Sequence, residues 1–220
     1  MTKTSSTGYW SSPEFRALMW GVNLELLQDY LATMENFIET ARGEYIEQSK
    51  NLTSQRVRQL REDMKAGKQV DFEFQEISVE EQVADNQIQL LDHFHHMWRG
   101  SFFITLYADF ESSLNEECRF WQGTDVSLQL DEIKGSATER AVIYWEKVLK
   151  FTFPKNSYWG DIHQGYRVLR NCIVHNAGSL DKEFSEGAKL KKFIEREDLL
   201  SLQGSSVILH KAFVIRLLTP

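Results

Sequence analysis

Apolar residues recur at helical spacing along most of this chain, and almost no proline interrupts them. Only three prolines occur among the 220 residues, and a proline inside a helix costs about 3 kcal/mol. One of them, Pro13, stands at the start of the longest apolar stripe, where a first-turn proline is favoured. That stripe consists of Phe15, Leu18, Met19, Val22, Leu26, Leu27, Tyr30, Leu31, Met34, Phe37 and Ile38. The pattern predicts an all-α protein with long helices.

Two capping boxes predict where later helices begin. Ser78 precedes Glu81 by three residues, and Ser136 precedes Glu139 by the same spacing. In a capping box each side chain accepts a hydrogen bond from the other residue's backbone N–H. Apolar stripes of period 3.6 follow both serines, and another runs through residues 161–178. We therefore expect a four- to five-helix bundle.

The bundle is expected to follow a long N-terminal helical extension. Residues 1–77 contain this extension and a short extended linker, in which Val70, Phe72 and Phe74 alternate with polar or charged residues. Residues 78–178 are expected to form the core of the bundle.

Residues 179–220 are expected to form a small C-terminal tail. The tail is polar to about Lys192, and apolar residues then return. Gly204 and the serines after it favour a β-hairpin between short strands at 199–202 and 207–210. A short helix is expected after the hairpin.

Basic residues gather near the end of the N-terminal extension, although the chain as a whole is acidic. The net charge of −7 argues against a protein that coats nucleic acid through a broad basic surface, so any contact with nucleic acid must be local. A solvated helix face is the ordinary interpretation of the basic run, and an RNA-contacting arm is the alternative. The run comprises Arg56, Arg58, Arg61, Lys65 and Lys68.

Membrane, metal and cofactor functions find little support in the residues. The chain has no run of eighteen apolar residues, and its start lacks the apolar core of a signal peptide, so we expect a cytoplasmic protein without membrane association. Cys118 and Cys172 fall at apolar helical positions, which favours buried hydrophobic residues over a disulfide or metal pair. Residues 92–96 contain metal-capable side chains, but no second ligand set accompanies them. Because common phosphate-binding, metalloprotease and hydrolase motifs are also absent, we expect neither metal nor cofactor.

The stretch 161–178, DIHQGYRVLRNCIVHNAG, carries the most distinctive chemistry. Its apolar stripe faces a core, and Gly178 favours a left-handed helix end. Arg170 adjoins Asn171, and His175 follows, so a cation, an amide and a titratable base share one rigid element. The polar side of the helix repeats every four residues, at His163, Arg167, Asn171 and His175.

An all-helical chain with R-N-x-x-x-H on its last long bundle helix resembles the HEPN superfamily. The motif here is Arg170-Asn171-Cys172-Ile173-Val174-His175, followed by Asn176. The resemblance covers roughly residues 78–178. The four-helix core that it implies consists of helices around 79–98, 101–121, 136–152 and 158–177.

The resemblance implies a metal-independent endoribonuclease that acts on RNA as a homodimer. In such a protein the helices carrying Arg170 and His175 from two protomers meet at one cleft. His175 would act on the ribose 2'-hydroxyl or the leaving oxygen, and Arg170 would stabilise charge on the phosphate. An acidic or polar residue of an earlier helix often assists in this family. Its best match is Glu111, with Asp109 as second choice.

The resemblance also implies a biological role. A toxin or phage-defence ribonuclease is expected, held in check by an antitoxin or sensor protein. Because many members of the family keep the fold without catalysis, the alternative is a non-catalytic HEPN-like dimeric interaction or sensor module.

The residue types suit metal-free cleavage of RNA. Histidine titrates near neutral pH, and arginine offers a planar cation that is always charged. Asn171 lies one turn before His175, where it can orient the imidazole or hold a phosphate oxygen. Arg170 and His175 are about 140° apart on an ideal helix, so only the length of arginine or a partner's helix brings both to one phosphate. Without a catalytic role, each would still complement the helix dipole, by about 0.3 to 1 kcal/mol.

Overall fold

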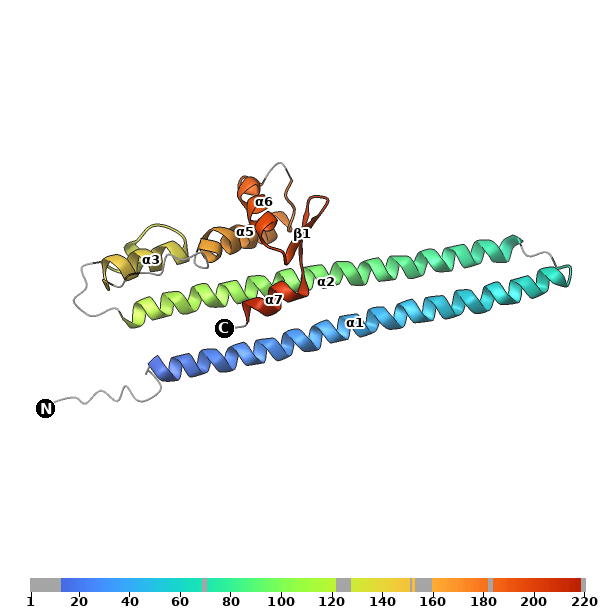
Figure 1. The fold of residues 1–220 in the computed structure, drawn as a ribbon, viewed down its shortest axis with the longest axis horizontal. Helices are drawn as coiled ribbons and strands as arrows, with labels where there is room; N and C mark the ends of the chain where they lie inside the picture. Colours follow the sequence, from blue (N-terminus) through green and yellow to red (C-terminus); the bar gives the residue numbers. More distant parts are fainter. Residues whose placement is uncertain are drawn as a thin grey trace. The chain divides into compact units, whose positions relative to one another are not determined.

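The computed structural model describes residues 13–68, 71–121, 128–150, 152, 160–181 and 184–218 (Figure 1). These residues are mostly helical, with one small two-stranded sheet near the C-terminus, which confirms the all-α prediction. By its contacts the chain divides into two units. The first unit comprises Met1–Met97 and Ile215–Pro220, and the second comprises Trp98–Val214.

The first unit is built around an antiparallel pair of long helices. Helix α1 (Pro13–Lys65) begins at the expected proline, and α2 (Asp71–Phe120) follows after a turn in which Gly67 has a φ of 76°. Side-chain pairs join the helices: Glu35 contacts His95, and Arg42 contacts Asp92. The partner's number falls from 95 to 92 as the α1 number rises from 35 to 42, so the helices run in opposite directions.

The expected extended linker and the helix start at Ser78 are both wrong. Helix α2 already begins at Asp71 and passes through Gly100 without a break, so the helices expected at 79–98 and 101–121 are one helix. A short alternation of apolar residues suits a strand only where another strand can accept its hydrogen bonds, whereas a helix satisfies its own backbone. Gly100 is buried, and a Cβ placed there would lie 3.4 Å from Ile173 Cγ2, so this glycine permits close packing on the R-N-x-x-x-H helix.

In the second unit, helix α3 (Ala137–Lys147) has the predicted capping box. The backbone N–H of Ser136 donates to Glu139 Oε2 at 2.8 Å, and the Glu139 N–H donates to Ser136 Oγ at 3.3 Å. The helix covers a buried cluster in which the thiol of Cys118 accepts a hydrogen bond from Trp145 Nε1. The buried members of the cluster are Cys118, Leu130, Ile133, Ala141 and Tyr144; Leu130 belongs to the 3₁₀ helix η2 (Leu130–Glu132).

The rest of the second unit packs around aromatic rings of the expected core stripe. The π-helix η3 (Asp161–Tyr166) leads into α5 (Arg167–Asn176). The ring of Tyr166 makes edge contacts with Phe103 of α2 and with Phe213 of α7 (Lys211–Leu217). These contacts fix α5 against the C-terminal half of α2.

The C-terminal tail contains the predicted hairpin and the predicted short helix. Strand β1 (Leu200–Gln203) pairs antiparallel with β2 (Ser206–Leu209), with Leu200 opposite Leu209. A further helix, α6 (Gly187–Arg196), lies in the segment that the sequence predicted to be polar to about Lys192. Its buried residues Leu190, Phe193 and Ile194 have helical spacing, which was the available signal.

Gly165 of η3 provides a test of how tightly α6 packs on this segment. A Cβ built at Gly165 would overlap the ring of Phe193, so Gly165→Ala is expected to destabilise the protein by about 1 to 3 kcal/mol. Gly160, the residue before η3, is the matched control: its φ is −59° and a Cβ there meets nothing within 4 Å. Gly160→Ala should be neutral or stabilising, by up to about 1 kcal/mol. Denaturant unfolding followed by circular dichroism measures both, and equal effects would show that the Phe193 contact is not tight.

Candidate functional site

The R-N-x-x-x-H segment lies on α5, whose C-terminal end is firmly fixed. Ala177 adopts the left-handed conformation with a φ of 47°, one residue before the glycine that was expected to do so, and Gly178 follows with a φ of 76°. The side chain of Asn176 donates to the Ser179 carbonyl at 2.6 Å and to Asp181 Oδ1 at 2.9 Å. These bonds hold the turn that carries His175.

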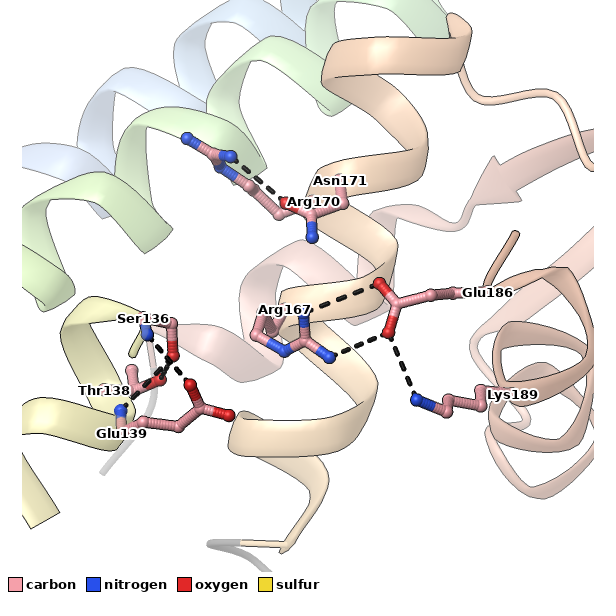
Figure 2. A network of polar contacts seen from close by, with 8 residues as sticks. All are labelled: Ser136, Thr138, Glu139, Arg167, Arg170, Asn171, Glu186 and Lys189. Atoms are coloured by element: carbon pink, nitrogen blue, oxygen red, sulfur yellow. Dashed lines mark hydrogen bonds and ion pairs between the residues drawn. The ribbon is translucent and has the colours of Figure 1, made fainter. Parts of the chain in front are cut away.

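Arg170 and Asn171 contact each other directly. The guanidinium of Arg170 donates from Nη1 to Asn171 Oδ1 at 3.1 Å, and both residues are half-buried (Figure 2). In this arrangement the Asn171 carbonyl orients Arg170. The sequence had instead suggested that Asn171 orients the imidazole of His175 or holds a phosphate oxygen. The guanidinium is therefore held in place by its own neighbour.

Glu111 of α2 lies within electrostatic range of Arg170. Burial raises the pKa of its carboxyl, and the charges of Arg170, Arg140 and Arg167 oppose this increase without cancelling it. The structure thus brings Arg170, Asn171 and Glu111 into one neighbourhood. Asp109, the second choice, is exposed.

Tyr107, one turn before Glu111, extends this neighbourhood into the core. Burial and the Glu111 charge raise the pKa of its hydroxyl to about 12, whereas Arg167 and Arg170 act in the opposite direction. The side chain of Thr138, close enough for a weak hydrogen bond with this hydroxyl, also acts to lower the pKa.

His175 is exposed and stands apart from the other three candidates. Within the described ranges it forms no hydrogen bond or ion pair with Arg170, Asn171 or Glu111. The angle of about 140° between Arg170 and His175 on a helix accounts for this separation. A single chain therefore presents the cation and the imidazole in different directions.

Two arginines near the site were not among the expected site residues. Arg167 of α5 donates to both carboxylate oxygens of Glu186, at 2.9 and 3.5 Å, and Lys189 contacts the same carboxylate at 3.3 Å (Figure 2). Burial acts to raise the pKa of Glu186, but the bonds from Arg167 and Lys189 outweigh it and the pKa falls. Arg167 had appeared on the predicted polar side of the helix. Arg140 carried no signal, because only the packing of α3 places it near Glu111.

Asp92 and His95, two of the metal-capable residues of α2, have structural partners. Asp92 pairs with Arg42 at 2.7 Å, and His95 contacts the fully buried Glu35 at 2.8 Å. Among the described residues, no group of three or more histidine, cysteine or acidic side chains could hold a metal ion. Cys118 and Cys172 are buried and free, as predicted, and burial raises the pKa of each thiol to about 11. The side chain of His163 lies outside the part of the structure that can be described.

The raised pKa of Glu111 predicts a pH-dependent effect on stability. A carboxyl whose pKa is higher in the folded state favours folding most at low pH, and this advantage is lost as the pH rises through the folded-state pKa. Glu111→Gln should therefore stabilise the protein at pH 7, and the gain should vanish as the pH falls below the ordinary glutamate range. Thermal melting across this pH range measures it. A loss of stability at pH 7 would mean that attraction to the arginines outweighs the cost of burial.

Comparisons of the chain with protein-family models, with curated proteins and with solved structures found no match. Within the described ranges, no helix combines the length and apolar character needed to cross a membrane.

Proposed function

We propose that this chain is a metal-independent endoribonuclease of HEPN type. The observation that carries the proposal is the arrangement around α5: Arg170 is held by Asn171 close to the half-buried Glu111, and an exposed histidine completes the R-N-x-x-x-H motif on the same helix. A fixed cation and an accessible imidazole are the two groups that metal-free cleavage of RNA requires.

In the proposed reaction the ribose 2'-hydroxyl attacks the adjacent phosphorus. His175 moves the proton of that hydroxyl or of the leaving 5'-oxygen, and Arg170 stabilises the charge that develops on the phosphate. Asn171 and Glu111 position the arginine. The P–O5' bond breaks, and the products are a 2',3'-cyclic phosphate and a free 5'-hydroxyl.

The active form proposed here is a homodimer with twofold symmetry. Arg170 and His175 point in different directions on α5, so a site with both groups is completed most simply by the helix of a second copy. The exposure of His175 supports such a contact, because the imidazole is available to a partner.

The cellular role proposed is that of a cytoplasmic toxin or phage-defence ribonuclease, restrained by an antitoxin or sensor protein. This part of the proposal rests on the family resemblance alone. Growth after induction of the wild type, compared with His175→Ala, would test it, and equal growth would count against toxicity.

The alternative function is a non-catalytic interaction or sensor module, and the first unit favours it. Its two long helices expose large apolar side chains that a protein in water normally covers. The side chains that are more than half exposed include Leu26, Phe37 and Leu52 of α1, and Leu90 and Met97 of α2.

RNA cleavage in excess chelator separates the two functions. The wild type should cut a structured RNA pool without added metal and leave 2',3'-cyclic ends. Arg170→Lys should retain only part of the activity, because an ammonium cannot reproduce the planar fork that holds Asn171 and a phosphate together. Activity that disappears with chelator and returns with magnesium would overturn the mechanism. No cleavage of any RNA would favour the interaction module.

A further inference from the structure

The helical hairpin of the first unit, formed by α1 and residues 71–97 of α2, exposes a row of large apolar side chains on each helix. Each residue of the two rows is at least 44% exposed. Within each row the residues recur at helical spacing, so each row forms a stripe along its helix. The α1 stripe consists of Phe37, Tyr45 and Leu52, and the α2 stripe consists of Val79, Val83, Leu90, Phe94 and Met97.

The two stripes lie on the same face of the helical hairpin. At about 100° per residue, the α1 stripe is displaced by roughly 80° from the buried Glu35 and Ile38. The α2 stripe is displaced by roughly 120° from Leu91 and His95, of which His95 contacts Glu35. Both displacements run in the same rotational sense along the chain. In antiparallel helices that sense leads to the same side of the pair, so the two stripes form one apolar face.

The opposite side of the helical hairpin is polar. Ser54 of α1 and Asp85 of α2 are displaced from the contact between the helices in the other rotational sense. They belong to a groove between the helices whose lining is entirely polar or charged. Its lining residues are Ser49, Lys50, Thr53, Ser54, Glu81 and Asp85. The helical hairpin as a whole is therefore amphipathic, and a pair of helices with one apolar side is half of a four-helix bundle.

The apolar face has the size of one half of a standard protein interface. Eight side chains of this kind, each about half exposed, offer on the order of 800 Å², whereas the largest apolar patch of a typical monomer covers about 300 to 600 Å². A standard interface takes about 800 Å² from each partner. A face of this size therefore matches a whole protein surface better than a single short segment.

The residues of this chain outside the described ranges are too few to cover the face. The longest such stretch is 1–12, in which Met1, Tyr9 and Trp10 are the only large apolar residues. Phe37, where the face begins, already lies about 36 Å along α1 from Pro13, and twelve extended residues span only about 40 Å. The occupant of the face must therefore come from another chain.

The charges beside the face favour a second copy of this chain as that occupant. Residues 71–92 of α2 contain seven acidic residues and no lysine or arginine. The basic run of α1, which ends at Lys68, lies at the same end of the helical hairpin, because a short turn joins α1 to α2. If two apolar faces stack about a twofold axis parallel to the helices, each α1 lies over the partner's α2 at the same level. The basic run of each copy then meets the acidic start of the other copy's α2.

We propose that the apolar face binds a second copy of this chain, and that two helical hairpins form a four-helix bundle with α1 of each copy over α2 of the other. The contacts of Glu35 with His95 and of Arg42 with Asp92 set the levels along the hairpin. They place Leu52 level with Val83. Phe37 is level with Phe94 by the same contacts. In the bundle each of these α1 residues packs on the partner's α2 residue at its level. The interface is separate from the proposed contact through α5 and does not depend on RNA cleavage.

Disulfide crosslinking of the full-length chain tests the interface directly. Chains with Leu52→Cys, mixed with chains carrying Val83→Cys and then oxidised, should form a product of twice the 25.7 kDa of one chain. Peptide mass spectrometry identifies the disulfide between the two introduced thiols. The native Cys118 and Cys172 are buried and should not react.

A mixture of Leu52→Cys with Phe37→Cys is the matched control, because these two residues lie at opposite ends of the α1 stripe. It should remain largely uncrosslinked. Efficient crosslinking of this control would overturn the proposed arrangement, since the two hairpins would then run in opposite directions. A second pair, Phe37→Cys with Phe94→Cys, should crosslink and keeps the test decisive where Leu52→Cys or Val83→Cys disturbs folding.

Charges placed on the face should prevent the crosslink. Adding Phe37→Glu and Leu90→Glu to the Leu52→Cys and Val83→Cys chains should lower the crosslinking yield by at least about tenfold, because an unpaired carboxylate is costly to bury. Ser54→Glu with Gln89→Glu adds the same two charges at exposed positions outside the apolar face and should leave the yield unchanged. Equal yields in the two charged backgrounds would mean that the apolar face is not the contact, and would overturn the inference.

The outcomes separate this inference from the proposed function. If neither the Leu52 and Val83 pair nor the Phe37 and Phe94 pair crosslinks, the second copy is excluded and a different protein covers the face. RNA cleavage by such a protein would leave the ribonuclease intact. Specific crosslinking in a protein that cuts no RNA would support the four-helix bundle and count against the ribonuclease.

Discussion

His175→Ala is expected to lower the rate of RNA cleavage by about 10²- to 10⁴-fold, the usual contribution of general acid-base catalysis. The side chain is exposed and forms no hydrogen bond among the described residues, so its removal should leave the melting temperature nearly unchanged. Rate and melting temperature measured on the same preparation test both statements. His93→Ala, which removes an exposed histidine of α2, is the control and should cut RNA at the wild-type rate.

The same variant tests whether two protomers build one site. If Arg170 of one copy acts with His175 of the other, mixing inactive Arg170→Ala with inactive His175→Ala creates mixed dimers with one intact site. With random exchange, half the dimers are mixed and half of their sites are intact, so about a quarter of the wild-type activity should return. No recovery in verified mixed dimers would mean that each chain uses its own pair. Undiminished activity of His175→Ala alone would remove the histidine from the mechanism.

Local signals in the sequence predicted the elements whose ends depend on local chemistry. The proline at the start of α1, the serine and glutamate that cap α3, and the glycine turn between β1 and β2 all act through neighbours in sequence. The start of α2 could not be found in this way. Its first turns contain an alternation that suits a strand, but among the described residues no strand pairs with them, and the helix is therefore preferable.

The candidate site was predictable to the extent that it lies on one helix. The motif placed Arg170 and Asn171 side by side, and their hydrogen bond follows from that. Glu111 was chosen from the family pattern at the edge of the aromatic stripe, and the packing of α2 on α5 brings it near Arg170. Arg140 lies on a third helix, and no spacing in the sequence connects it to the motif. Its position depends on how α3 packs, which is a property of the tertiary fold.

The buried pair of Glu35 and His95 is expected to have a larger effect on stability than the exposed pair of Arg42 and Asp92, which joins the same two helices. Glu35 is 0% exposed, and His95 Nε2 donates to its carboxylate at 2.8 Å with only 13% of the histidine side chain exposed. Loss of a hydrogen bond to a charged group costs about 1.5 to 3 kcal/mol, and loss of one member of a buried ion pair costs about 3 to 5 kcal/mol. His95→Ala should therefore destabilise the protein by about 3 kcal/mol in denaturant unfolding.

Arg42→Ala is the matched control for His95→Ala, because Arg42 joins the same two helices through Asp92. Both partners of that pair are more than 40% exposed, so solvent screens the charges and the loss should stay below about 1 kcal/mol. Replacing Glu35 and His95 together by leucine should recover most of the stability lost in His95→Ala, because no charge then remains buried. Equal losses in His95→Ala and Arg42→Ala would contradict this account, since burial would then have no influence on the strength of the pair.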